Sequence, residues 1–177
     1  MKHTTENTNY SMRDYGDYPD GSGRTKPALI LMVGGPGAGK SYTRSKRYGF
    51  LPFVCADAIK ATHPDYDPKD PSAVHIWSTQ IAVQQCLTKC GAGETFVYDS
   101  TGTNLERMLT IINAARAAGH DIHAVLVACP LATALRRNAE RERTIDADAV
   151  RAIHANVAES WVVLQGMVDT TEIIDNG

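Results

Sequence analysis

Apolar residues gather in five short runs along the chain, and most of these runs are separated by segments with helical spacing. The runs cover residues 28–33, 53–56, 95–99, 122–129 and 171–174. Near-continuous apolar runs of this length are typical of strands buried on both faces, as in a parallel sheet. The alternation of strands and helices therefore predicts an α/β fold with a five-stranded parallel sheet between layers of helices.

The segments between these runs predict helices at residues 41–47, 72–91, 105–118, 131–142 and 146–167. In the second of them, Val74, Trp77 and Ile81 recur at helical spacing, and the preceding Pro71 suits a first helical turn. Gly119 is expected to end the third helix. Residues 58–68 predict only a short helical turn that runs into a loop rich in proline and aspartate.

The first 27 residues differ from the rest of the chain because glycine, proline and aspartate break any periodicity there. We expect a flexible arm over residues 1–27 and one domain over residues 28–177. A chain of 177 residues that is 43% hydrophobic can build one sizeable core, and nothing in it requires a second domain.

The formal net charge of the chain is −2, so its surface is not basic overall. This disfavours a nucleic-acid partner but does not exclude one, because a local basic groove can coexist with a slightly acidic total. No apolar run is long enough to cross a bilayer, and the first residues lack the apolar segment of a signal peptide. We expect a soluble, cytoplasmic protein with no membrane partner; the oligomeric state is not predicted.

The strongest motif is the sequence GGPGAGKS at residues 34–41, directly after the first apolar run. It fits the P-loop pattern, in which the backbone N–H groups of a glycine-rich turn bind phosphate oxygens. Lys40 is predicted to bind the β- and γ-phosphates, and the Ser41 hydroxyl to ligate Mg²⁺. The predicted nucleotide-binding residues are Gly35, Gly37, Ala38, Gly39, Lys40, Ser41 and Tyr42. The motif thus indicates binding of ATP or GTP with Mg²⁺.

Two acids follow apolar runs, at the sheet edge where folds of this kind bind their ligands. Asp99 ends the third run and is predicted to hold Mg²⁺ together with Ser41; its alternative role is to cap the next turn. Asp57 follows the second run and is predicted to be a general base that takes the proton of an acceptor hydroxyl. The alternative for Asp57 is an N-cap of the turn that begins at Ala58.

A cluster of arginines, Arg136, Arg137, Arg141 and Arg143, follows the fourth run. Arg137 and Arg141 are one helical turn apart, so both can lie on one side of a helix. We expect a lid over about residues 136–146 whose arginines stabilise the transferred phosphoryl group, and the sequence does not choose between Arg137 and Arg141. The alternative is a solvated charged face, since Glu140 and Glu142 are interleaved with the arginines.

Three stretches carry a family resemblance: GGPGAGKSYTRS, CADAIKATHPDYDP and VYDSTGTNLERMLTIINAARAAGHDIHAVLVACP. Together they resemble the zeta-toxin-like P-loop kinases, whereas ALRRNAERERTIDADAVRAI is more similar to the lid of phage polynucleotide kinases. The resemblance extends over most of the chain from Ala28 onward. It implies a P-loop kinase-type three-layer sandwich with a helical lid.

The same resemblance implies roles for individual residues. Lys40 and Ser41 would bind the nucleotide and Mg²⁺, and Asp57 would be the base. The implied acceptor contacts are Lys60, Thr101, Thr103, Asn104 and Arg107. Tyr42 departs from the Ser or Thr often found after the P-loop serine, so the surroundings of the predicted Mg²⁺ ligand Ser41 differ from the usual pattern.

The resemblance also bears on the acceptor. The longer C-terminal region of the toxins is missing, which disfavours a sugar-nucleotide acceptor. The chain is similar in compactness to phage kinases that phosphorylate hydroxymethyluracil within DNA, which would place it in the host cytoplasm. We expect transfer to a nucleic-acid hydroxyl, on a modified pyrimidine or at a 5′ end. A kinase of a UDP-linked amino sugar and a non-catalytic NTP-binding switch are the alternatives.

Overall fold

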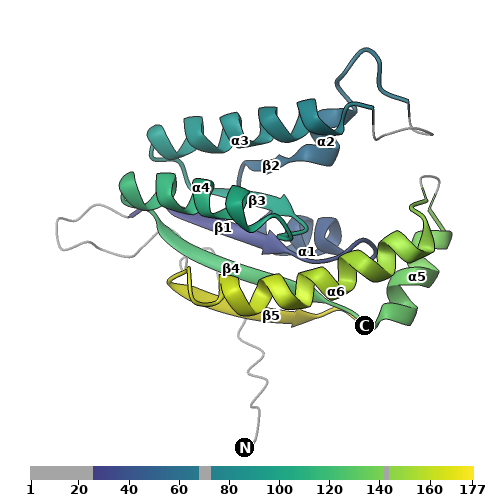
Figure 1. The fold of residues 1–177 in the computed structure, drawn as a ribbon. Coiled ribbons are helices and arrows are strands. Elements are labelled where there is room, and N and C mark those ends of the chain that lie inside the picture. Colours follow the sequence, from purple (N-terminus) through teal and green to yellow (C-terminus); the bar gives the residue numbers. More distant parts are fainter. Residues whose placement is uncertain (1–25, 68–72, 142–143) are drawn as a thin grey trace, which may run out of the picture.

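The computed structural model describes residues 26–67, 73–141 and 144–177, and the order of elements follows the alternation expected from the sequence (Figure 1). The strands are β1 (Ala28–Val33), β2 (Phe53–Cys55), β3 (Phe96–Ser100), β4 (Asp121–Ala128) and β5 (Thr170–Asp175). The helices are α1 (Lys40–Tyr48), α2 (Ala56–Lys60), α3 (His75–Gly91), α4 (Leu105–Ala117), α5 (Leu131–Ala139) and α6 (Ala147–Leu164).

All neighbouring strands pair in parallel, and their order across the sheet is β2-β3-β1-β4-β5. The central strand β1 is buried at every position, which explains its uninterrupted apolar sequence. The five-stranded parallel sheet predicted from the sequence is thus confirmed.

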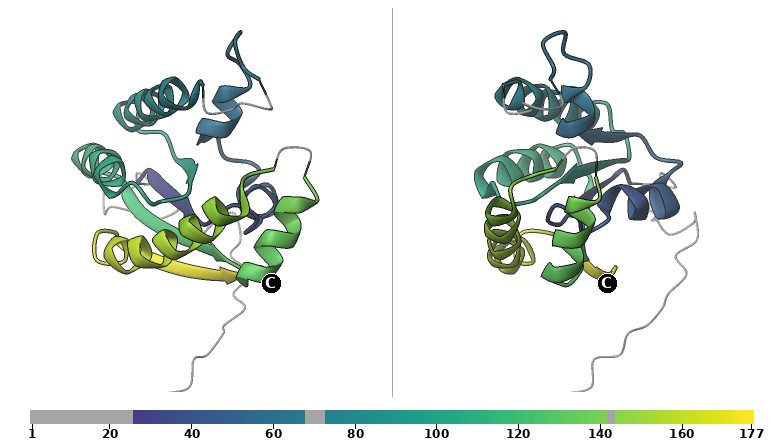
Figure 2. Two further views of the ribbon diagram at one scale, coloured as in Figure 1. Left: turned by 45° about the vertical axis from the view of Figure 1, so that its right-hand side comes forward. Right: turned by 90° about the vertical axis from the view of Figure 1, so that its right-hand side faces the viewer.

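Alternate residues of β1 point into two separate cores, because side chains of a strand alternate between the faces of a sheet. Leu29, Leu31 and Val33 pack with apolar residues of α3, α4 and α6. Ile30 and Met32 pack on the opposite face, where α1 contributes the buried Tyr48. Figure 2 shows these three layers, with α1 alone on one side of the sheet and α3, α4 and α6 on the other. The predicted three-layer sandwich is therefore observed.

Several element boundaries differ from the sequence expectations by a few residues. The second strand ends at Cys55, and the chain turns at once into α2, so Asp57 lies within the first turn of a helix. The helix expected from residue 72 begins at His75, and the expected start at residues 70–72 lies outside the described part of the chain. The helices expected over residues 131–142 and 146–167 end earlier, at Ala139 and Leu164.

Two expectations fall largely outside the described residues. The expected flexible arm, residues 1–27, is described only at residues 26 and 27, and the expected lid lacks residues 142–143. Among the helices that are described, none is long and apolar enough to cross a membrane.

Candidate active site

The order of the strands brings the predicted site residues together at one edge of the sheet. Because all strands are parallel, the P-loop after β1, the 100–104 loop after β3, and helices α2 and α5 all begin at this carboxyl edge. β2 and β3 lie on one side of β1, and β4 lies on the other. Figure 2, right, looks onto this edge, with α2 and α5 at opposite ends. The P-loop is thus flanked by Asp57 on one side and the arginines of α5 on the other.

The P-loop has the tight turn that its glycines predict. Gly37 and Gly39 adopt positive φ angles of 79° and 89°, a region that side-chain-bearing residues rarely occupy. Lys40 begins α1 and folds back over the loop, so that its Nζ donates to the carbonyl oxygens of Gly34 at 2.7 Å and Gly35 at 3.2 Å. The lysine ammonium is thereby held inside the turn in which phosphate groups are predicted to bind.

Side chains from three other elements hold the outer carbonyl groups of the P-loop. His154 Nε2 of α6 lies 3.3 Å from the Pro36 oxygen, and Arg137 Nη1 of α5 donates to the Gly37 oxygen at 3.3 Å. After β5, Asn176 Nδ2 donates to the Ala38 oxygen at 2.8 Å. Because these carbonyl groups are bound from outside, the loop is held in one conformation before a nucleotide arrives.

The pKa of the Lys40 ammonium is influenced by its burial and by nearby charged groups. Burial lowers the pKa of the Lys40 ammonium, because a charged group loses solvation there. Asp99, Cys55 and Asp57 oppose this shift, whereas Arg141 adds to it. Lys40 therefore experiences charges from both flanks of the P-loop.

Asp99 is buried in β3, between Met32 of β1 and Cys55 of β2. Burial raises the pKa of its carboxyl group, while Lys40 and Arg44 oppose the shift. Arg44 Nε of α1 donates to Asp99 Oδ2 at 3.3 Å, and its guanidinium group stacks 3.5 Å from the centre of the Phe53 ring. Lys40 and Arg44 therefore offset part of the free energy that burial of an ionised Asp99 carboxylate costs.

Asp57 projects from the first turn of α2 with a side chain that is 67% exposed. Its Oδ1 accepts a hydrogen bond from Lys60 Nζ at 3.1 Å, and Lys60 itself is buried. The alternative role of Asp57, as N-cap of a turn beginning at Ala58, is not observed, because α2 begins at Ala56 and Cys55 occupies the N-cap position. An exposed carboxylate held by a buried lysine is accessible to an incoming acceptor.

The loop after β3 contains the hydroxyl groups that the resemblance implies as acceptor contacts. Gly102 has a φ of 77° and lies against Val33, so a side chain at this position would collide with β1. The turn places Thr101 Oγ1 and Thr103 Oγ1 3.0 Å apart. Asn104 instead caps α4, because its Oδ1 accepts a hydrogen bond from Arg107 N at 2.9 Å.

The arginines of α5 divide into two kinds. Arg137 Nη1 also donates to the Asn176 oxygen at 2.8 Å, so this side chain joins the P-loop to the segment after β5. Arg141 lies beyond the end of α5 and is exposed. Both line an open cavity of about 590 Å³ with Gly37, Gly39, Tyr42, Glu140 and Asn176. Arg143 lies outside the described residues.

Asn138 closes the connection between α5 and α6. This buried side chain donates to the Ile145 oxygen at 2.7 Å and accepts from the Ile145 nitrogen at 3.1 Å. Asn138 therefore joins the last turn of α5 to Ile145, just before α6, within the range where the lid is expected.

Sequence reasoning missed three residues that shape this site: Arg44, His154 and Asn176. The ring of His154 packs so closely on the loop that a Cβ on Gly35 would lie 2.6 Å from its Cδ2 atom. No local pattern marks either His154 or Asn176, because each acts by contact with a loop more than a hundred residues away. For Arg44, its position one turn after Lys40 was a usable signal, since it places the side chain beside the same edge.

A model of the family named zeta toxin matches residues 16–176, which is most of the chain. The chain belongs to the zeta toxin family. No curated protein matches it in sequence. The membership confirms the resemblance found in the sequence.

Solved structures of similar fold are distant from this family member in sequence. A chain of the PezAT chromosomal toxin–antitoxin system of Streptococcus pneumoniae is 16% identical, with a TM-score of 0.65 over 85% of this chain and 69% of that one. A candidate kinase from Chloroflexus aurantiacus J-10-fl is 18% identical, with a TM-score of 0.60 over 85% and 89%. A chain of the Pnkp1/Rnl/Hen1 RNA repair complex is 18% identical, with a TM-score of 0.59 over 77% and 46%.

At such identities the solved structures establish the fold and not the substrate. Together with the family, they support a P-loop kinase that binds a nucleoside triphosphate. The individual site residues, the metal and the acceptor remain predictions.

Proposed function

We propose that the protein transfers the γ-phosphoryl group of ATP or GTP to a hydroxyl of a nucleic acid, on a modified pyrimidine or at a 5′ end. The observation that carries this proposal is the position of Lys40, whose Nζ is held within the P-loop, with Asp57 in the first turn of α2 on one flank and Arg141 in the cavity beside Gly37 and Gly39 on the other. Phosphoryl transfer requires a nucleotide cradle, an oriented nucleophile and positive charge for the transition state. The carboxyl edge offers a candidate for each.

The donor nucleotide is proposed to lie along the P-loop, with its phosphates on the N–H groups of the glycine-rich turn and on Lys40. The cavity lined by Tyr42, Arg137, Arg141 and Asn176 adjoins Gly37 and Gly39, so it is the place for the nucleoside part. Tyr42 is 63% exposed there and offers a ring face for a base.

Ser41 and Asp99 fit the role of magnesium ligands in their chemistry, because Mg²⁺ prefers oxygen donors. Asp99 is a buried carboxyl group whose pKa is raised by burial, with Lys40 and Arg44 opposing this shift, and Ser41 is exposed at the start of α1. When bound, the ion would neutralise charge on the β- and γ-phosphates.

In the proposed transfer, the acceptor oxygen attacks the γ-phosphorus and the bond from this phosphorus to the β,γ-bridging oxygen breaks. The acceptor proton passes to an Asp57 carboxylate oxygen, and the nucleoside diphosphate leaves with the bridging oxygen. Lys60 is proposed to orient the Asp57 carboxylate through the hydrogen bond from its Nζ to Asp57 Oδ1. Arg141 is proposed to stabilise the charge of the transferring phosphoryl group, because it is exposed and acts on Lys40. Arg137 instead positions the loop.

The alternative acceptor is a UDP-linked amino sugar, which the membership of the zeta toxin family favours. The nucleic-acid acceptor is favoured by the lid sequence and by the similarity to a chain of an RNA repair complex. A non-catalytic switch would bind the nucleotide without turnover that depends on an acceptor.

An acceptor screen with γ-labelled ATP tests the proposal. The candidates are hydroxymethylated DNA, 5′-hydroxyl oligonucleotides, nucleosides and UDP-linked amino sugars. Label in either nucleic acid supports the proposal, and label only in the amino sugar replaces it with the alternative. Tight binding of ATP without transfer to any acceptor would favour the switch and contradict the proposed function.

A further inference from the structure

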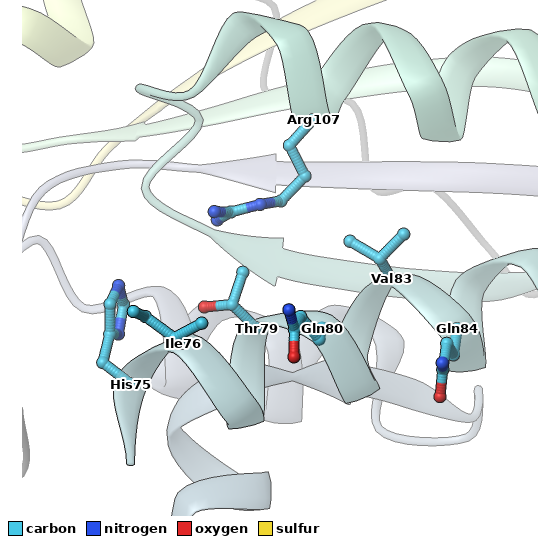
Figure 3. A pocket seen from close by; sticks show the side chains of 7 residues that line it. All are labelled: His75, Ile76, Thr79, Gln80, Val83, Gln84 and Arg107. Atoms are coloured by element: carbon cyan, nitrogen blue, oxygen red, sulfur yellow. The ribbon is translucent and has the colours of Figure 1, made fainter. Parts of the chain in front are cut away.

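A second open cavity of about 620 Å³ lies between α3 and α4, away from the P-loop. Its lining includes Ile76, Thr79, Gln80 and Val83 of α3 and Arg107 of α4 (Figure 3). Both helices begin at the carboxyl edge, because α4 follows β3 and α3 leads back to the start of β3. The cavity therefore begins on the acceptor side of the proposed site.

The electrostatic character of this cavity is positive. Arg107 reaches from α4 across the space towards the first half of α3, as Figure 3 shows. Its guanidinium group also bonds to the buried Tyr98, whose pKa burial raises to about 12. None of the described residues that line the cavity is a carboxylate. An arginine in an open cavity whose described lining contains no carboxylate favours an anionic group such as phosphate.

The floor of the cavity contains a hydroxyl group that lacks a partner. Thr79 is 7% exposed, and its Oγ1 forms no hydrogen bond within the described part of the chain. A buried polar group without a partner costs free energy. Because no hydrogen bond holds this hydroxyl, rotation about χ1 would turn it towards the cavity without breaking one. Thr79 can thus donate to a ligand that Arg107 attracts.

The remaining lining suits a flat heterocycle. Gln80 contributes an amide that can donate to and accept from a base edge, and Gln84 lies one helical turn further along α3. Ile76 is 73% exposed, and Val83 projects towards α4, so both provide apolar surface for a ring. A cavity of about 620 Å³ falls within the range of small-molecule sites.

We propose that the cavity between α3 and α4 binds a nucleoside phosphate unit of the acceptor, with its phosphate at Arg107 and Thr79 and its base at Gln80. The favoured source is the nucleotide next to the reacting one in a polynucleotide strand; the other source is the nucleotide part of a nucleotide sugar. Helix α2, which carries Asp57, packs against α3, and His63 just after α2 lies on Trp77 of α3 with ring centres 4.5 Å apart. This inference rests on the proposed function and extends it to the recognition of the acceptor.

The test is direct binding of a fluorescein-labelled single strand of six deoxythymidylates, measured by anisotropy. We expect thymidine monophosphate to displace this probe at least about tenfold more effectively than thymidine, because only the former carries a phosphate. Thr79→Val and Gln80→Ala should each weaken binding of the strand about tenfold. Gln85→Ala is the matched control, since Gln85 is exposed on α3 outside the cavity and should bind as the wild type does.

Unfolding is separated from loss of the site by the melting temperature. Thr79→Val keeps the shape of the side chain and removes an unpartnered hydroxyl, so its melting temperature should equal or exceed that of the wild type. Equal displacement by thymidine and its monophosphate, or wild-type affinity of both variants, would overturn the inference even if the acceptor screen succeeds.

A UDP-linked amino sugar is the second arm of the experiment. If the sugar nucleotide binds, the strand does not bind, and both variants weaken binding of the sugar nucleotide, then the cavity holds the nucleotide part of a sugar nucleotide. This result would support the nucleoside phosphate site and contradict the nucleic-acid acceptor. If neither the strand nor the sugar nucleotide binds, the inference fails.

Discussion

At the scale of single residues, the proposed chemistry centres on Lys40, whose pKa burial lowers and whose charge is influenced by Asp99, Asp57 and Arg141. Asp57 and Arg141 are far apart in sequence, yet both act on this one ammonium group. Because one is exposed on α2 and the other lies beyond α5, their substitution should separate acceptor activation from transition-state stabilisation.

Asp57→Asn is expected to slow transfer strongly while nucleotide binding persists. The amide cannot accept the acceptor proton, so kcat should fall by roughly 10²–10⁴-fold. The dissociation constant for ATP should stay within about twofold. Asp148→Asn, the same change at an exposed site on α6, is the control and should keep wild-type turnover. Unchanged turnover in Asp57→Asn would show that Asp57 is not the base.

Arg141→Ala should mainly lower kcat, whereas Arg137→Ala should mainly lower the melting temperature and weaken ATP binding. Loss of a cation at the transferring phosphoryl group should lower kcat by about a thousandfold in Arg141→Ala, with little change in melting temperature. Arg137→Ala should lower the melting temperature and weaken ATP binding, because the Gly37 and Asn176 oxygens lose their donor. Arg136→Ala is the control, since Arg136 is exposed and pairs with Glu140 on the outer side of α5. The reverse assignment would follow if Arg137→Ala lost the greater part of kcat without destabilisation.

At the scale of elements, α1 is tied to the edge of the sheet by charges as well as by Tyr48. Arg47 Nη1 of α1 lies 2.7 Å from Glu172 Oε1 of β5, and His123 Nε2 of β4 lies 3.7 Å from Oε2. Partial burial raises the pKa of the Glu172 carboxyl, but the interactions with His123 and Arg47 outweigh it, so the pKa lies below its usual value. Since the side chain is 23% exposed, this network can contribute measurably to stability.

Glu172→Gln should therefore destabilise the protein in a pH-dependent way. A carboxyl whose pKa is lowered by folding stabilises the fold above its unfolded pKa of about 4.3, and this contribution is lost as the pH falls through the folded value. At pH 7 we expect a loss of roughly 1 kcal/mol, or about 2–4 °C in melting temperature. The difference between variant and wild type should shrink below about pH 4.

Thermal melts between pH 3 and pH 8 measure this effect. Glu159→Gln on the exposed surface of α6 is the control and should follow the wild type throughout. A pH-independent difference for Glu172→Gln would mean that the ionised carboxylate contributes nothing beyond its shape.

At the scale of the whole molecule, the fold holds the P-loop from several elements at once, so nucleotide binding should stabilise the entire domain. Ligand at about 100 times its dissociation constant adds about 2.7 kcal/mol. In a domain of this size that corresponds to a rise of about 5–10 °C in melting temperature. Lys40→Ala should lose most of this rise, because the phosphates lose their cation.

Differential scanning calorimetry with and without ATP and Mg²⁺ measures the rise. Lys26→Ala is the matched control, because Lys26 lies before β1 and pairs with Asp121 at the opposite edge of the sheet. An equal rise in the wild type and in Lys40→Ala would contradict the assignment of Lys40 to the phosphates.

The sequence by itself determined the parallel α/β fold, the P-loop and the family resemblance. These features depend on local patterns: the run at residues 28–33 is apolar because β1 is buried on both faces, and Gly37 and Gly39 are required by positive φ angles within one turn. The position of Asp57 was predicted only approximately, because Ala56 and Cys55 carry no signal that separates the end of a strand from the start of a helix.

Only the tertiary structure decided which side chains surround the P-loop and how α3 and α4 meet. His154 and Asn176 bind its carbonyl groups across more than a hundred residues of chain, and Arg137 is distinguished from Arg141 by its contact with the Asn176 oxygen. The cavity at Thr79 and Arg107 likewise requires two helices to lie side by side. Such contacts follow from the order of the strands in the sheet, which is set by the packing of the whole core rather than by any local pattern of residues.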